Sequence, residues 1–154
     1  MKMNKPKYDF ISSDQITQFK DEDKSINLIS GKFGNVEGPV KGHNVEPIYF
    51  DIELKDGKKI DIDVPDTHNS FVYLLRGDIK IGTKNHETIK DSTLILLEKG
   101  DSLNISARKN SRFLFIAGKP INEPIARGGP FVMNTKQEIL QAIKDYNDGT
   151  FAKY

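Results

Sequence analysis

The sequence predicts a mainly β fold, an antiparallel β-barrel or β-sandwich with one C-terminal α-helix. Three observations support this. Residues 60–82 read as an alternating strand, a polar corner, an apolar strand, a glycine turn and a short return strand, and residues 94–118 echo that order. A helical apolar stripe follows in residues 136–147. A chain of 154 residues has the length of one domain and buries about 68–70 % of its unfolded surface, so we expect a real core.

The N-terminal stretch, residues 1–25, is expected to be an arm or linker. It is polar and contains Pro6. The run that begins at Ser12 can cap one or two helical turns that carry Ile16 and Phe19. A short strand is then predicted at residues 26–30.

The middle of the chain predicts closely spaced strands. Residues 47–54 and 59–64 alternate between apolar and polar side chains, and Asp56-Gly57 supplies the turn of a hairpin between them. Residues 71–75 are apolar on both faces of a strand, so we expect that strand to be sandwiched. Further short strands are predicted at residues 88–90, 93–97, 102–107 and 112–117. Short strands without long helices between them favour an antiparallel sandwich or barrel.

The C-terminal helix is predicted at residues 136–147. Thr135 and Glu138 fit a capping box, and Gly149 stands where the helix should end. One stripe of the helix is apolar, which requires a surface to pack on. That stripe consists of Ile139, Leu140, Ile143 and Tyr146.

Composition excludes several classes of function. Lys and Arg number 23 against 22 Asp and Glu, so charge gives no reason to expect nucleic acid or an anionic membrane as a partner. The absence of cysteine excludes disulfides and thiol nucleophiles and fits a cytoplasmic location. No apolar run approaches the roughly 20 residues of a membrane helix.

Two motifs resemble known families. Residues 64–118 resemble a cupin barrel. Glu123-Pro124-Ile125, followed by Gly-Gly-Pro-Phe-Val-Met-Asn-Thr at residues 128–135, is similar to the C-terminal signature of the pirin family. The likeness covers nearly the whole chain, so residues 26–154 are identified as a pirin-like C-terminal cupin domain that includes the helix.

The resemblance implies that this chain corresponds to one part of a two-domain protein. Pirins consist of two stacked cupin barrels, and this chain resembles the linker and the C-terminal barrel. The family's iron or related metal binds to a His-rich motif in the N-terminal barrel. Some pirins act as transcriptional co-regulators and others bind metabolic enzymes. The family's quercetinase-like dioxygenase activity would then depend on a barrel outside the part that this chain resembles.

The general cupin ligand pattern tests this barrel for a metal site of its own. With Gly77 as the turn glycine, the glutamate slot falls at Ser70, and with Gly100 as the second turn glycine, a histidine slot falls at Leu103. The two remaining histidine slots fall at Asp63 or Val64 and at Pro65 or Asp66. Because the pattern lacks most of its donors, we expect no metal and no cofactor here.

Histidine and aspartate side chains outside this pattern also give little indication of a metal site. His43, His68 and His86 are scattered through loop-like contexts, which favours surface or hydrogen-bonded corner positions over ligand roles. A site for a hard cation such as Ca²⁺ or Mg²⁺ would need the carboxylates of Asp51, Asp61, Asp63 and Asp66. Acidic residues that alternate along a strand usually form its solvent-exposed face instead.

Strand parity predicts what fills the barrel. If Ser70 and Leu103 point inward, so do other members of the same two strands. The predicted lumen consists of Ser70, Val72, Leu74, Leu103, Ile105 and Ala107. It is either a packed core, which we favour, or a pocket for a small apolar ligand.

Three functions remain open at this stage. The chain is a metal-free structural or interaction half, the matching half of a quercetin 2,3-dioxygenase-type oxygenase, or a cupin that binds a small apolar ligand. The predicted interface residues are Phe131, Val132, Met133, Ile139, Leu140, Ile143 and Tyr146. They would form a homodimer, bind a separate metal-bearing cupin chain, or fold back on the chain's own barrel.

Overall fold

The computed structural model of the chain describes residues 8–41, 44–82 and 88–151. The chain divides into two compact units. One is Phe10–Pro120, and the described residues of the other are 8–9 and 121–151. Within the described residues, no helix is both long and apolar enough to cross a membrane.

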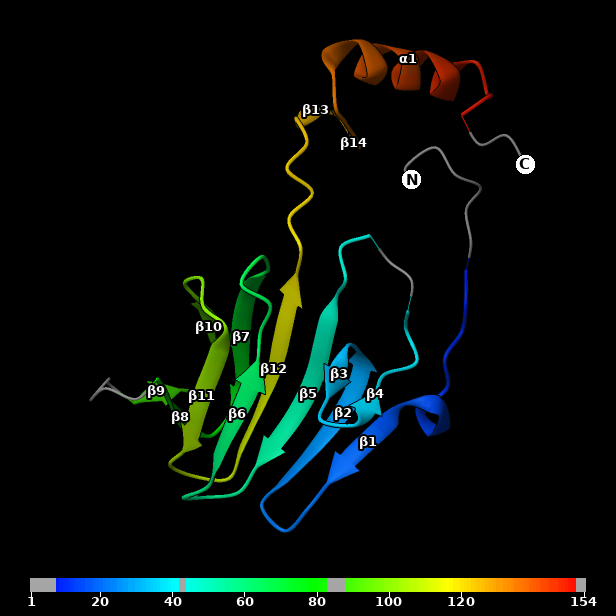
Figure 1. Cartoon of the computed structure of the whole chain (residues 1–154). Coiled ribbons are helices and arrows are strands. Elements are labelled where there is room, and N and C mark those ends of the chain that lie inside the picture. Colours follow the sequence, from blue (N-terminus) through cyan, green and yellow to red (C-terminus); the bar gives the residue numbers. More distant parts are fainter. Residues whose placement is uncertain (1–7, 42–43, 83–87, 152–154) are drawn as a thin grey trace. The chain divides into compact units, whose positions relative to one another are not determined.

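The first unit is a sandwich of two antiparallel sheets (Figure 1). The six-stranded sheet has the order β1 (Thr17–Lys20), β2 (Lys24–Ser30), β5 (Ile48–Leu54), β12 (Ser111–Gly118), β7 (Asn69–Arg76) and β10 (Thr93–Leu96). The four-stranded sheet has the order β6 (Lys59–Asp63), β11 (Ser102–Ala107), β8 (Asp78–Ile81) and β9 (Ile89–Lys90). A small hairpin joins β3 (Lys32–Phe33) to β4 (Val36–Glu37).

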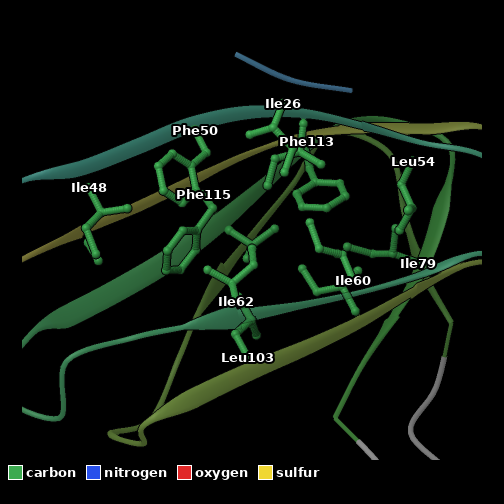
Figure 2. Packing of buried hydrophobic residues seen from close by; sticks show 14 of the residues in the cluster. Ile26, Ile48, Phe50, Leu54, Ile60, Ile62, Ile79, Leu103, Phe113 and Phe115 are labelled. Carbon is green, nitrogen blue, oxygen red and sulfur yellow. The ribbon is translucent and has the colours of Figure 1, made fainter. Parts of the chain in front are cut away.

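The core lies between the two sheets. Figure 2 shows Phe50, Phe113 and Phe115 of the six-stranded sheet facing the branched side chains of the four-stranded sheet. Every second residue of β5, β6, β11 and β12 is buried, as the alternation in the sequence predicts. The predicted fold class is confirmed, in its sandwich form.

Two local predictions are wrong. The helical turn is only the 3₁₀ segment η1 (Ser13–Gln15), and Phe19 lies in β1, which pairs with β2. The Phe19 ring contacts that of Phe33 edge to face, with 5.2 Å between centroids, so tertiary packing overrides the weak helical pattern. In β7, Val72 and Leu74 are buried but Leu75 is exposed, so the sandwich buries only one face of this strand.

The second unit packs a hairpin against a helix. Strands β13 (Ala126–Gly128) and β14 (Phe131–Met133) pair, and α1 (Lys136–Asn147) follows. The helix has the predicted bounds and the predicted capping box, in which the Thr135 hydroxyl accepts a hydrogen bond from the Glu138 amide. A Cβ atom on Gly128 would lie 2.4 Å from Ile139 Cγ2, so a larger residue here would force the Ile139 side chain or the hairpin to shift.

Candidate functional site

The sandwich unit contains a cavity of about 190 Å³ at one end of the two sheets. Its lining comes from the residue after β6, the start of β7, the end of β8, the loop after β10 and the first half of β11. The lining residues are Val64, Ser70, Ile81, Gly82, Leu97, Glu98, Lys99, Gly100, Ser102, Leu103 and Asn104.

Backbone hydrogen bonds hold the walls of this cavity in place. The Val64 amide donates to the carbonyl oxygen of Asp101 at 2.9 Å, and the Leu97 amide donates to that of Ser70 at 3.1 Å. The Gly82 amide donates to the Asn104 carbonyl oxygen at 2.9 Å. Because these bonds join residues that are distant in sequence, the shape of the cavity is fixed by the fold rather than by any one loop.

Three cavity residues occupy slots of the cupin ligand pattern. Val64, which is one of the two residues considered for the first histidine slot, lines the same cavity as Ser70 and Leu103. Val64 is 7 % exposed and Leu103 is 5 % exposed. Two aliphatic side chains and one hydroxyl therefore stand where a cupin metal would need imidazole and carboxylate groups, which do not fit an iron, nickel or zinc ion.

Two polar members of the lining, Ser102 and Asn104, lie on β11. Ser102 and Asn104 alternate along β11 with the buried Leu103 and Ile105, so their side chains lie on the outer face of the sheet. The Asn104 amide confirms this, because it donates a hydrogen bond to the Asp61 carboxylate across the outer face. Among the strand side chains that line the cavity, Ser70 supplies the hydroxyl that faces the interior.

The other predicted lumen residues lie in the packed core. Val72, Leu74, Ile105 and Ala107 are buried within the main hydrophobic cluster and do not line the cavity. The predicted lumen is therefore part core and part cavity, and Ser70 and Leu103 are the members that face open space. No sequence pattern pointed to Ile81, Leu97 or the loop at residues 98–100 as lining residues, because only the tertiary fold brings these segments to β11.

His68 is a hydrogen-bonded corner residue. It is 3 % exposed, and its Nε2 lies 2.9 Å from the Glu46 carbonyl oxygen while its Nδ1 lies 3.3 Å from Thr67 Oγ1. A carbonyl oxygen only accepts, so Nε2 carries the proton. His43 and His86 lie outside the described residues. In residues 8–41, 44–82 and 88–151 no group of three or more His, Asp or Glu side chains could hold a metal ion.

The acidic side chains of the alternating strands have other partners. Asp51 accepts two hydrogen bonds from Arg112, at 2.9 Å from Nε and 2.7 Å from the terminal nitrogen. The hydrogen bond and charge of Asp51 raise the pKa of the Arg112 guanidinium. Asp51 and Asp61 belong to different sheets, which does not favour the hard-cation site that the sequence left open.

The predicted interface residues all belong to the hairpin and helix unit. Ile139 is buried together with Ala142, and Phe131 and Met133 are partly buried. The Phe131 ring lies 6.1 Å from that of Tyr146 and 5.1 Å from that of Phe151. The exposed apolar members are Val132, Leu140, Ile143 and Tyr146. The role of these residues in an interface stays a prediction.

Comparison with solved structures identifies close relatives of this fold. The chain resembles a crystal structure of quercetin 2,3-dioxygenase from Acinetobacter baumannii with a TM-score of 0.81 and 31 % identity. The match covers 96 % of this chain and 51 % of that one. Structures below 25 % identity, such as an RmlC-like cupin from Shewanella frigidimarina with a TM-score of 0.51, support the cupin fold alone.

Sequence comparison gives the same family. The chain is 33 % identical to a pirin of Homo sapiens over 96 % of its own length and 51 % of the relative. It is 31 % identical to a pirin-like protein of Caulobacter vibrioides over 98 % of its length and 54 % of that protein. The chain thus spans about half the length of these curated relatives. Residues 49–152 match the pirin C-terminal cupin domain, and the chain belongs to the pirin family.

Proposed function

We propose that this chain acts as a pirin C-terminal cupin domain without a metal site of its own, in a structural or protein-interaction role. One observation carries the proposal. Val64, Ser70 and Leu103 converge on one cavity at the slots where cupins place metal donors. Aliphatic and hydroxyl groups bind first-row metals too weakly to replace imidazole and carboxylate ligands.

A second candidate function follows from one comparison. The similarity to the quercetin 2,3-dioxygenase of A. baumannii favours membership in an oxygenase of that type. In that case this chain corresponds to the matched half of such an oxygenase, and a separate metal-bearing cupin domain supplies the redox chemistry. The residues of the present cavity do not fit a metal, so we assign them no step in oxygen chemistry.

The volume of the cavity is relevant to whether the domain binds a small ligand. At about 190 Å³ it is smaller than the 300–1,000 Å³ of usual small-molecule sites. Its walls are mixed: the apolar side chains of Val64, Ile81, Leu97 and Leu103 lie beside polar residues, which are Ser70, Ser102, Asn104 and the loop at residues 98–100. The small volume supports a structural role over capture of a small apolar ligand.

Charge and cysteine content support the remaining assignments. The near balance of 23 basic and 22 acidic residues gives no electrostatic attraction to nucleic acid or to an anionic membrane. The absence of cysteine supports a cytoplasmic location. A protein partner is therefore the class of partner that we propose.

Metal analysis tests the proposal directly. The chain is purified without a metal-affinity tag, incubated with one equivalent of Fe(II), Ni(II) or Zn(II), desalted, and analysed for each element. We expect well under one metal per chain and no consumption of oxygen with quercetin. One metal per chain that is lost in His68→Ala or Asp66→Asn, but retained in the control Asp91→Asn, would overturn the proposal.

A further inference from the structure

The cavity of the sandwich unit combines apolar side chains with one hydroxyl group that faces inward. Val64 and Leu103 are buried, and Ile81 and Leu97 are partly buried and pack against the same core. Ser70 lines the cavity from the inward side of β7. Sites for small molecules have this kind of lining, in which apolar walls supply contact area and a few polar groups fix the orientation of the ligand.

The Ser70 hydroxyl is available for a hydrogen bond. Its backbone carbonyl oxygen accepts from the Leu97 amide at 3.1 Å, but its side-chain oxygen has no hydrogen-bond partner among residues 8–41, 44–82 and 88–151. The buried hydroxyls of Ser30 and Ser111 instead contact backbone carbonyl oxygens. A hydroxyl donates one hydrogen bond and also accepts, so Ser70 can pair with a polar group of a ligand. A purely apolar ligand would leave it unpaired, which weakens binding.

The charged residues of the lining favour a neutral ligand. They are Glu98 and Lys99, which are exposed and adjacent in the loop after β10. Neither forms an ion pair within the part of the chain that the structure describes. Their opposite charges give no net attraction for an anion or a cation. An ionised group would also lose its hydration between the apolar walls, and one hydroxyl does not compensate for that loss.

The volume of the cavity limits the ligand to a single ring. The cavity of about 190 Å³ is larger than an engineered apolar cavity of about 150 Å³ that binds benzene. One six-membered ring with one small substituent therefore fits. Larger ligands occupy sites of about 300–1,000 Å³, so the three rings of a flavonol such as quercetin do not fit here.

We propose that this cavity binds a neutral phenol, a ligand with one aromatic ring and one hydroxyl group. The ring contacts the side chains of Val64, Leu97 and Leu103, and the phenolic hydroxyl forms a hydrogen bond with the Ser70 hydroxyl. An apolar ring that displaces poorly ordered water from such walls gains affinity. The proposal goes beyond the structural role proposed above, because it gives the domain a ligand of its own that requires no metal.

Titration of the full 154-residue chain with phenol, followed by NMR of the backbone amides, tests the proposal. We expect the amide signals of Ser70, Gly82 and Leu103 to shift with a Kd of about 1 mM, which is reasonable for a ligand of about seven non-hydrogen atoms. Quercetin should not shift these signals, because it is too large for the cavity. Shifts of the same three signals with quercetin would contradict the size limit.

Toluene separates the hydrogen bond from the apolar contact, because a methyl group replaces the hydroxyl on a ring of the same size. Ser70→Ala should weaken binding of phenol about 2- to 10-fold, the effect of one neutral hydrogen bond, and should leave the affinity for toluene unchanged. Ser70→Leu should fill the cavity and abolish binding of both compounds. The matched control Ser106→Ala removes a hydroxyl from the outer face of β11 and should change neither affinity.

Several results would overturn the proposal. Phenol at about ten times the expected Kd could leave the signals of the lining residues unchanged, or shift only signals from other parts of the chain. Equal weakening of phenol and toluene in Ser70→Ala, or equal weakening of phenol in Ser106→Ala, would exclude the assigned hydrogen bond. If Ser70→Leu does not fold by circular dichroism, the smaller Ser70→Val replaces it, and undiminished binding in the folded variant places the ligand elsewhere. Absence of phenol binding leaves the metal-free structural role standing, and stoichiometric metal would refute that role without deciding whether phenol binds.

Discussion

Gly77 and Ser111 lie so close together that a Cβ atom on Gly77 would be 2.4 Å from the Ser111 hydroxyl oxygen. Gly77 turns the chain between β7 and β8 with φ of +95°. The buried Ser111 hydroxyl lies 2.7 Å from the Lys109 carbonyl oxygen and 3.1 Å from that of Asp78. This contact joins the turn to the start of β12.

Gly77→Ala should therefore lower the free energy of unfolding by about 3 kcal/mol or more. The left-handed backbone costs about 1–2 kcal/mol for a residue with a side chain, and forcing an atom into packed structure adds about 1–3 kcal/mol. Gly57→Ala is the matched control, because Gly57 has φ of +71° but no atom within 4 Å of its Cβ position. Urea unfolding should show only the first cost there. Equal losses in both variants would contradict the close contact.

His68 should be a structural residue. His68→Leu removes the donor to the Glu46 carbonyl oxygen and should cost about 1–2 kcal/mol of unfolding free energy, while His68→Gln keeps a donor and should cost less. Denaturant unfolding measures both. The same two proteins should also have the same metal content as the wild type. A loss of bound metal without a loss of stability would point to a ligand role instead.

The sequence predicted the sandwich because local pattern and burial agree there. Ile60 and Ile62 alternate with charged residues, and both are buried. The capping box at Thr135 predicted the start of α1 for the same reason, since its hydrogen bonds are local. Phe19 was predicted in a helical turn because the spacing of nearby apolar residues suggested one. Its pairing with Ile26 of β2 is a tertiary contact, which that local spacing does not reveal.

The cavity and the outward side of β7 depend on longer-range structure. Strand parity placed Ser70 and Leu103 toward the interior, but it could not separate cavity from packed core. That difference arises where Leu97 and Gly82 meet β11. The apolar run around Phe71 predicted that both faces of β7 are covered. The sandwich covers one of them, and the other faces outward beside Leu94 and Leu96.

The start of α1 should be sensitive to acid. The Glu138 carboxylate accepts hydrogen bonds from the amides of Thr135 at 2.8 Å and Asn134 at 3.1 Å. The Thr135 amide and then the Thr135 hydroxyl lower the pKa of Glu138 below its usual 4.5. Because the pKa is lowered in the folded state, this stabilisation is fully present above pH 4.5 and is lost as the pH falls through the folded-state pKa.

Hydrogen exchange at the Thr135 amide, which donates to the Glu138 carboxylate, can follow this loss. We expect exchange to speed up as the pH falls below 4.5, after correction for the intrinsic rate. Glu138→Gln cannot titrate and should show no such step. Thr135→Ala should destabilise the helix at all pH values by about 1 kcal/mol. A step of the same size in Glu138→Gln would show that another group is responsible.

The cupin slots can be tested by placing donors in them. The triple variant Val64→His/Ser70→Glu/Leu103→His gives the cavity two imidazoles and one carboxylate, the donor set of an open zinc or nickel site. Loss of two buried aliphatic side chains should lower its stability without metal. Ni(II) or Zn(II) should then raise the free energy of unfolding, by about 2.7 kcal/mol at 100 times the dissociation constant.

The matched control keeps the same donors but moves one of them out of the cavity. In Val64→His/Ser70→Glu/Ser106→His the last imidazole lies on the outer face of β11, three residues from Leu103. Thermal unfolding with and without metal should show stabilisation of the first variant only, because a metal needs its donors within about 2.3 Å of a single point. Equal stabilisation of both variants would mean that Val64, Ser70 and Leu103 do not converge as the shared cavity indicates.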